Sequence, residues 1–472
     1  MNNTNIKSLA NKFYNFEIKH DLFSLRIKNK VYWDYVRLYI FEEIVHSHFG
    51  KRPYKDGKKR ILHLAINLLK YFFARMFSFV FSNKNYDIIL INYNRNNIVD
   101  NKHVNIHMYF TAKCIDPEKT LLIDPSGDTQ NKDDYLCKIL NAKSTYIYAR
   151  FLSKLIMFNR AERNKLINLK GLIKRNFDVD INIQSVAKNI FGYQVLLGKQ
   201  YRRLFKLYNP SIIIYCDNGY MKGIADEASK NNIIKIDHQH SLISYLNVLY
   251  NYKSSSINCI TSTIPDYIFT FGDYWLDKIN TMSKPITVGF PYFDHKYKKL
   301  IASKSIEKSK SIIIISMLTG NSKSILIDYA IALSMRLPDW TIYYKLRNYE
   351  FKSWKETYPK EILRENIIMV DSNVPELYDI FSKCSYQIGI NSTAIYEGIA
   401  FGLSTILIKT GWYQEAEPLY LNNKAFLVDN YEEAYQIIIK NKTIDEPVDK
   451  NSIFAENSIH NTVNALKNIN LQ

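Results

Sequence analysis

The sequence predicts an α/β protein in which two Rossmann-like domains face each other across a cleft, with a helical extension at the N-terminus. The length of 472 residues exceeds that of one ordinary domain, because domains average about 150 residues. After residue 85, short β-branched runs alternate with helical stretches, as in α/β folds. Most of these runs are continuously apolar, which parallel strands buried on both faces require.

The apolar runs form two series, which predict two parallel sheets. The first series consists of residues 86–91, 120–123, 211–215, 233–236, 266–270 and 286–290. The second consists of residues 311–316, 341–345, 367–370, 386–390, 405–408 and 425–428. A Lys- and Ser-rich segment over 291–310 separates the two series. We therefore expect an extension over 1–84, a first domain over 85–290 and a second domain over 291–472.

The chain is strongly basic, with 63 Lys and Arg against 45 Asp and Glu, a formal net charge of +18. Such a balance favours anionic partners, namely nucleic acid, acidic lipid or phosphorylated substrates. The alternative is codon bias, because the chain is rich in Lys, Asn, Ile and Tyr, as proteins from AT-rich genes are. No motif of the common nucleic-acid-binding folds is present, so we expect no nucleic-acid partner.

The cysteines are scattered, odd in number and never arranged as C-x-x-C. They are Cys114, Cys137, Cys216, Cys259 and Cys384. This pattern argues against a disulfide framework and a structural zinc site, and it fits a reducing compartment. The first residues lack the apolar core of a signal peptide. We therefore expect a cytoplasmic protein.

The N-terminal region differs from the rest of the chain. Its aromatic-rich run over 31–41 predicts a helix. Residues 61–81 predict a wide apolar helical face with a narrow polar stripe, but Lys70 and Arg75 near the middle make it costly to span a bilayer. The segment is either a helix packed on the protein's own core or an interfacial helix, which would contact anionic lipid on the inner face of the cell membrane.

The sharpest local pattern is the segment 389–402. A buried strand ends at Ile390, and Ser392 or Thr393 can cap the helix that follows. Free N–H groups and the helix dipole favour an anion there, at the strand edge where open α/β sheets bind ligands. Glu397, one turn into the helix, can accept hydrogen bonds from ribose hydroxyls. The alternative is an ordinary capped helix in which Glu397 only complements the dipole.

Two other strand ends in the second series carry polar groups. Lys345 and Arg347 end a strand that should neighbour the first site, and Arg suits bidentate phosphate contacts. The alternative is solvated charge at a strand end. Ser316, Thr319 and Gly320 follow the first strand of the series and could approach a ligand closely, although an ordinary βα turn has the same pattern.

In the first series, the strand over 233–236 is followed by Asp237, His238 and His240. An Asp or a His at a strand end can act as a general base. Two His and one Asp could bind a metal, but no third spaced ligand is apparent, so we expect no metal site. The structural alternative is open, because loop histidines often serve the fold alone.

Four blocks of the sequence, in this order, resemble a bacterial family of GT-B glycosyltransferases from capsule and O-antigen loci. The blocks are Tyr32-Trp33 to Arg37, Asp266 to Trp275, Val288 to Tyr292, and Ser392 to Gly402. The chain is also similar, more distantly, to bacterial sialyl- and Kdo-transferases and to the polyol-phosphate transferases of teichoic acid synthesis. The resemblance covers most of the chain.

The chain departs from the family pattern at two places. Gln239-His240 is followed by Ser241, where such relatives usually have Gly. The second domain has Lys345-Leu346-Arg347-Asn348 where they usually have Lys-Leu-His-Pro, an element that serves the CMP end of the donor in the related sialyltransferases. Glu350 does fall where the pattern has an acidic residue.

The resemblance implies a transferase that moves a sugar from a nucleotide donor to a growing surface glycan. The second domain would hold the nucleotide donor, with Ser392 and Thr393 at the phosphate, Lys345 or Arg347 beside them, and Glu397 at the ribose. The first domain would hold the acceptor glycan, with His240 or Asp237 as the base.

No D-x-D sequence stands at a predicted strand end, so we expect transfer without a metal or other cofactor. Two alternatives stay open: a polyol-phosphate transferase with a CDP-linked donor, and a non-catalytic paralogue that binds glycan or a partner transferase. The sequence predicts no oligomeric state.

Overall fold

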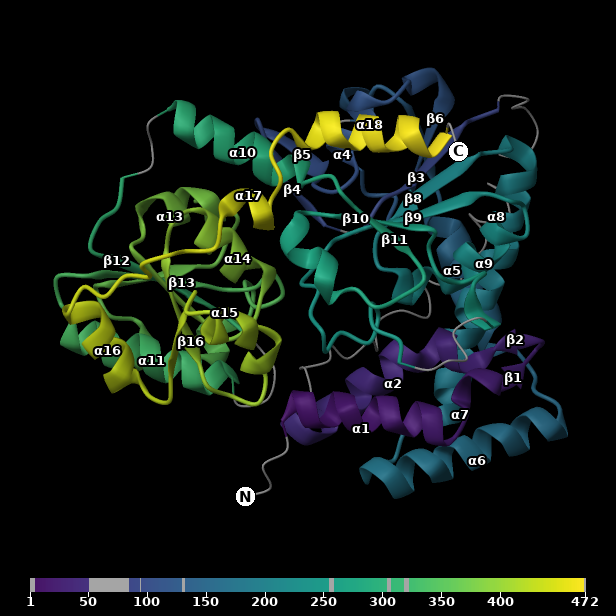
Figure 1. The fold of residues 1–472 in the computed structure, drawn as a ribbon, viewed down its shortest axis with the longest axis horizontal. Helices are drawn as coiled ribbons and strands as arrows, with labels where there is room; N and C mark the ends of the chain where they lie inside the picture. The colour runs from purple at the N-terminus through teal and green to yellow at the C-terminus, as the bar shows by residue number, and fades with distance from the viewer. Residues whose placement is uncertain are drawn as a thin grey trace.

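The computed structural model describes residues 5–50, 85–93, 95–129, 132–253, 259–303, 307–317 and 322–470. Two parallel sheets lie side by side, each covered by helices on both faces, and the N-terminal helices lie along one end of the molecule (Figure 1). The fold thus has the two-domain α/β architecture that the alternating runs predict.

The first sheet has the strand order β11-β10-β9-β8-β3-β6-β7, and all its strands are parallel. Its strands are β3 (Ile88–Ile91), β6 (Thr120–Asp124), β7 (Lys138–Asn141), β8 (Ile212–Tyr215), β9 (Ile234–His238), β10 (Tyr267–Thr270) and β11 (Lys284–Thr287). Side chains alternate between the faces, so Ile89 and Ile91 pack on one side and Ile88 and Leu90 on the other.

The second sheet has the order β14-β13-β12-β15-β16-β17 and is also parallel throughout. Its strands are β12 (Ser311–Ile315), β13 (Thr341–Lys345), β14 (Ile367–Val370), β15 (Tyr386–Gly389), β16 (Ser404–Ile408) and β17 (Phe426–Val428). Within the described residues, two small antiparallel pairs complete the strands: β1 (Arg26–Ile27) with β2 (Lys30–Val31), and β4 (Asn96–Val99) with β5 (Lys102–Asn105).

The helices fall into three groups along the chain. The N-terminal and first-domain helices are α1 (Ile6–Lys19), α2 (Tyr32–Phe49), α4 (Tyr109–Cys114), α5 (Lys143–Lys154), α6 (Arg160–Phe177), α7 (Ile183–Val186), α8 (Tyr193–Tyr208) and α9 (Asn218–Ser229). The second-domain helices are α11 (Ser322–Arg336), α12 (Trp354–Thr357), α13 (Leu377–Lys383), α14 (Thr393–Ala400), α15 (Glu417–Leu421) and α16 (Tyr431–Ile439). The crossing helices are α10 (Pro291–Ala302), α17 (Lys450–Ile453) and α18 (Ser458–Asn470).

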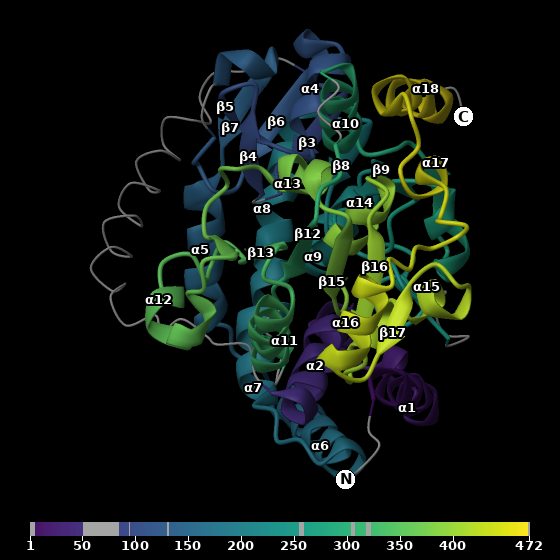
Figure 2. The same ribbon diagram turned by 90° about the vertical axis from the view of Figure 1, so that its left-hand side faces the viewer.

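One apolar core runs through both domains. It joins the α4 side of the first sheet to α10, α13, α14 and α18. Aromatic pairs cross the boundary: Trp275 lies 4.8 Å from Tyr396, and Phe293 lies 5.9 Å from Phe401, between ring centroids. After α16 the chain returns to the first domain, where α18 lies beside α4 and α10 (Figures 1 and 2).

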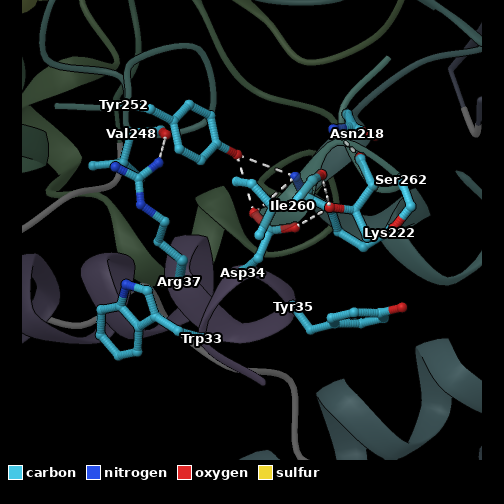
Figure 3. A network of polar contacts seen from close by, with 12 residues as sticks. Trp33, Asp34, Tyr35, Arg37, Asn218, Lys222, Val248, Tyr252, Ile260 and Ser262 are labelled. Atoms are coloured by element: carbon cyan, nitrogen blue, oxygen red, sulfur yellow. Dashed lines mark hydrogen bonds and ion pairs between the residues drawn. The ribbon is translucent and has the colours of Figure 1, made fainter. Parts of the chain in front are cut away.

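Helices α1 and α2, which we call the N-terminal brace, are held to the first domain by buried charge (Figure 3). Arg37 Nε donates to Glu17 Oε1 at 2.5 Å, and its guanidinium also donates to the carbonyls of Val248 and Asn251. Because Arg37 is only 2% exposed, each of these bonds is formed away from water, where an unpaired charge is costly.

A second buried pair, Asp34 with Lys222, lies one helical turn along α2. Lys222 Nζ is 3.1 Å from Asp34 Oδ1, and both the Tyr252 and the Thr263 hydroxyls donate to the same carboxylate. The brace also reaches the second domain, because Ile6 N donates to Gly411 O at 3.3 Å. It therefore contacts both walls of the space between the domains.

All twelve predicted runs form strands, with ends that shift by at most a few residues. The helix expected over 31–41 is α2, which continues to Phe49. The division into 1–84, 85–290 and 291–472 stays a prediction. That division does not include the return of α18 to the first domain. The segment 61–81 lies outside the described residues. Within the described residues, no helix is long and apolar enough to cross a bilayer.

The brace gives a stability prediction. Arg37→Ala should leave Glu17 buried without its partner and lower the free energy of unfolding by about 3–5 kcal/mol. Chemical denaturation of the full chain measures this loss. The matched control is exposed Arg203→Ala, which should change the free energy by no more than about 0.5 kcal/mol. Equal effects for the two variants would contradict the role given to Arg37.

Candidate functional site

Both sheets reverse their strand order at one point. In the first sheet the reversal lies between β3 and β8, and in the second it lies between β12 and β15. In open α/β sheets, ligands bind outside the carboxyl ends of the strands at this switch point. A ligand site is therefore expected among the segments that follow these four strands.

A cavity of about 260 Å³ lies at the switch point of the second sheet. We call it the switch-point cavity. Its second-domain wall includes Met317, Arg347 and Asn391, which follow β12, β13 and β15. Its other wall is the brace and the loop after β9, contributed by Leu38, Phe41, Glu42, Val45, Leu246, Asn247 and Val248. The cavity is therefore formed by both domains.

Arg347 is held in this wall by Ser316 and Glu350. Arg347 Nε donates to the Ser316 carbonyl at 3.0 Å, and Arg347 N donates to Glu350 Oε2 at 2.8 Å. Ser316 Oγ donates to the same carboxylate oxygen at 2.7 Å. Glu350 is buried, so it fixes the ends of β12 and β13 together. The Ser316 carbonyl and the Glu350 carboxylate together position Arg347.

A second cavity of about 130 Å³, which we call the hinge cavity, contains Lys345 and Glu397 from the second domain and Arg95 from the first. Lys345 Nζ donates to Ser372 O at 2.8 Å, and burial lowers the pKa of Lys345 to about 8. Burial also raises the pKa of Glu397, an effect that the charge of Arg95 opposes. Cationic and acidic groups from both domains meet in this space.

Ser392 and Thr393 lie at the start of α14, as predicted, but they line neither of these two cavities. Ser392 Oγ accepts from Ala394 N at 3.2 Å, so it serves as the helix cap. The preceding residue, Asn391, lines the switch-point cavity and donates to Glu415. Thr319 and Gly320 lie outside the described residues. The structure therefore does not bring Ser392, Thr393, Lys345 and Arg347 into one cavity.

His240 lies at the switch point of the first sheet, next to Asp217. Its Nε2 is 3.8 Å from Asp217 Oδ2 and 3.2 Å from Ser241 Oγ. The imidazole lies against Tyr93, with 4.9 Å between ring centroids. The side chain is about a tenth exposed, and burial, with the charge of Arg95, lowers the pKa of His240 to about 3. It is therefore neutral at physiological pH.

The other two predicted residues of this loop are more deeply buried. His238 and Asp237 are 1% and 0% exposed. They are consecutive in β9, so their side chains face opposite sides of the sheet. Asp237 lines a void of about 10 Å³ with Asn218 and Tyr250. His238 lies on the side of the sheet that carries His107.

Asp217 is the residue that sequence reasoning missed. Burial and the nearby charge of Glu42 raise the pKa of Asp217 to about 7, and its backbone is left-handed, with φ 65°. Strained backbone and a shifted carboxyl pKa both occur most often at functional sites. Its position two residues after the predicted strand 211–215 was a usable signal. Arg95, four residues after the strand 86–91, could have been found in the same way.

No family model and no curated protein matches the chain. Similar solved structures include the glycotransferase of kitacinnamycin, at 9% identity over 82% of this chain and 99% of the other, with a TM-score of 0.48. They also include a UDP-GlcNAc 2-epimerase from Methanocaldococcus jannaschii, at 12% identity over 82% of this chain and 99% of the other, with a TM-score of 0.46. A third is the wall teichoic acid polymerase TagF, at 11% identity over 88% of this chain and 99% of the other, with a TM-score of 0.45. Likeness at this level assigns no activity.

The fold itself is clear from the two sheets of this chain. Two parallel, doubly wound sheets face a shared cleft, with the helical extension packed at one end. The predicted GT-B class, two Rossmann-like domains with an N-terminal extension, is therefore confirmed.

The raised pKa of Asp217 predicts a pH-dependent stability. Folded Asp217 keeps its proton up to about pH 7, whereas an unfolded Asp loses it near pH 3.9. The wild-type free energy of unfolding should therefore fall as pH rises through this interval, by about 1.4 kcal/mol per unit. Asp217→Asn cannot lose a proton, so its stability relative to wild type should rise up to about pH 7 and then level off.

Denaturation of both proteins at several pH values between 4.5 and 8.5 measures this difference. Exposed Asp339→Asn is the control. A constant difference between wild type and Asp217→Asn across the range would show that Asp217 is not the titrating group.

Proposed function

We propose that the protein is a glycosyltransferase that moves a sugar from a nucleotide-sugar donor to a bacterial surface polysaccharide of the capsule or O-antigen type. The observation that carries the proposal is that both sheet switch points adjoin the space between the domains. Arg347 lines the switch-point cavity at one of them. The Asp217–His240 pair lies at the other, next to Arg95 of the hinge cavity, whose guanidinium donates to the His240 carbonyl. Glu42 connects the two, because it lines the switch-point cavity and raises the pKa of Asp217.

The donor would lie against the second domain, with its phosphates near Arg347. The cations that face the cleft from both domains, Arg347, Lys345 and Arg95, can balance a diphosphate without Mg²⁺. A guanidinium also matches phosphate oxygens in pairs. Asn391 and Glu397 are available for the sugar and ribose hydroxyls, while Ser392 and Thr393 orient the N–H groups at the start of α14.

The acceptor hydroxyl would lie against the first domain. Its pKa is far above 7, so transfer profits from a base within hydrogen-bonding reach. Asp217, half ionised near pH 7, is suited to take the proton, and neutral His240 can orient the hydroxyl or pass the proton on. Contact of residues 61–81 with anionic lipid would bring this site to a membrane-bound glycan.

A first experiment tests the donor side. Arg347→Ala should weaken nucleotide affinity by roughly ten- to hundredfold, because a charge-assisted hydrogen bond contributes about 1.5–3 kcal/mol. The main-chain bond from residue 347 to Glu350 does not involve the side chain, so the loop should persist. Calorimetric titration with UDP, GDP, CMP and CDP measures the affinity, and exposed Arg364→Ala is the control. Unchanged affinity would remove Arg347 from the donor site.

A second experiment tests the base. His240→Ala should cut turnover at least about a hundredfold, the lower end of what general base catalysis contributes, because Asp217 would lose the group that orients the hydroxyl or passes on its proton. Nucleotide binding should stay intact. Asp217→Asn should do the same, and the double variant should be little worse, because residues that act as a unit are not additive. Slow hydrolysis of nucleotide sugars is the readout, with exposed His460→Ala as control.

The outcomes separate the alternatives. A loss of under tenfold in His240→Ala would leave Asp217 alone as the base. Nucleotide release only from a CDP-linked polyol would assign polyol-phosphate transfer. Absence of any nucleotide binding would favour a non-catalytic paralogue.

A further inference from the structure

Three potential metal ligands meet behind the switch point of the first sheet. They are His107, which lies between β5 and α4, Cys216 at the end of β8, and His238 at the end of β9. One ligand atom from each residue lies within 4.8 Å of the other two. All three side chains are at most 1% exposed. Segments distant in the sequence thus place two imidazoles and a thiol in one enclosed space.

Within the described part of the chain, three of the four imidazole nitrogens in this space lack a hydrogen-bond partner. His238 Nδ1 lies 3.0 Å from the Gln239 carbonyl, which can only accept, so this nitrogen carries the proton and Nε2 keeps a lone pair. Within the described part of the chain, His238 Nε2 and both ring nitrogens of His107 have no hydrogen-bond partner. Leaving such groups unpaired in a protein interior costs free energy. A backbone bond of this kind is also what orients a metal-binding histidine.

The Cys216 thiol is acted on by the carboxyl groups of Asp217 and Asp237 and by the guanidinium of Arg95. Burial, more than these groups, raises the pKa of Cys216. An ion that binds there must therefore displace the thiol proton.

We propose that His107, Cys216 and His238 bind one divalent transition-metal ion of the Zn²⁺ class. Thiolate and imidazole ligands suit such ions and do not suit Mg²⁺ or Ca²⁺. Donors in a tetrahedral zinc site are about 3.5 Å apart, so side-chain rotations must close the present spacing by about 1 Å. Binding replaces the thiol proton, which leaves to solvent as the metal–sulfur bond forms.

The ion would cross-link the ends of β8 and β9 to the segment before α4. Asp217 directly follows one ligand, and His240 lies two residues beyond another. The ion therefore fixes the backbone that presents the Asp217–His240 pair. It lies in the first domain, and the inference does not depend on the proposed transferase activity.

Cobalt titration of the metal-free full chain tests the proposal. Wild type should bind one equivalent of Co²⁺ and develop the near-ultraviolet absorption of a cobalt–thiolate bond. Zn²⁺ should displace the Co²⁺ and raise the melting temperature, and Mg²⁺ should do neither. A wild-type chain that binds no Co²⁺, or binds it without thiolate absorption, overturns the proposal without the use of any variant.

Variants then identify the ligands. Cys216→Ser should abolish the thiolate absorption. His238→Gln should lower Co²⁺ affinity by more than the roughly ten- to hundredfold that loss of an outer-shell partner costs. Cys384→Ser is the matched control, because Cys384 is also buried but lies in the second domain. Absorption that survives in Cys216→Ser and is lost in Cys384→Ser would place the metal elsewhere and overturn the assignment.

Discussion

The packing of the N-terminal brace on the first domain depends on the pairing of one buried charge, that of Arg37. A guanidinium that is excluded from water must find acceptors in every direction of its planar fork. Glu17 of α1 supplies two of them, and the carbonyls of Val248 and Asn251 supply two more. One side chain thereby fixes the packing of α1 on α2 and the path of the loop after β9. That loop and α2 are the first-domain wall of the switch-point cavity, so the shape of the site depends on a pair distant from it.

The apolar contact between the domains is the second feature on which the site depends. Aromatic side chains of the first domain and of the crossing helices lie against α13 and α14, as in the pairs Trp275–Tyr396 and Tyr292–Tyr378. This packing joins the two domains through one apolar core. The polar groups therefore gather at the strand ends around the two cavities, while the rest of the boundary is largely hydrocarbon.

The sequence was sufficient for the sheets and insufficient for the site. The run 311–316 could be identified as a strand because all five residues of β12 are buried, and burial of that kind leaves a continuous apolar pattern. Strand β7 was missed because it is an edge strand, with Lys138 and Asn141 exposed. Arg347 could be found because its cue, a strand end, is local. Asp217 owes its raised pKa first to burial and then to Glu42 on α2, and no pattern near residue 217 encodes either.

The chain passes between the domains twice, once after α10 and once between α16 and α17. Each connection limits how far one domain can move against the other, and two connections limit it more than one. The residues that line the switch-point cavity from both domains are therefore held in place by the covalent chain as well as by the shared apolar core. A cut in either connection would remove part of this restraint while the other kept the domains tethered.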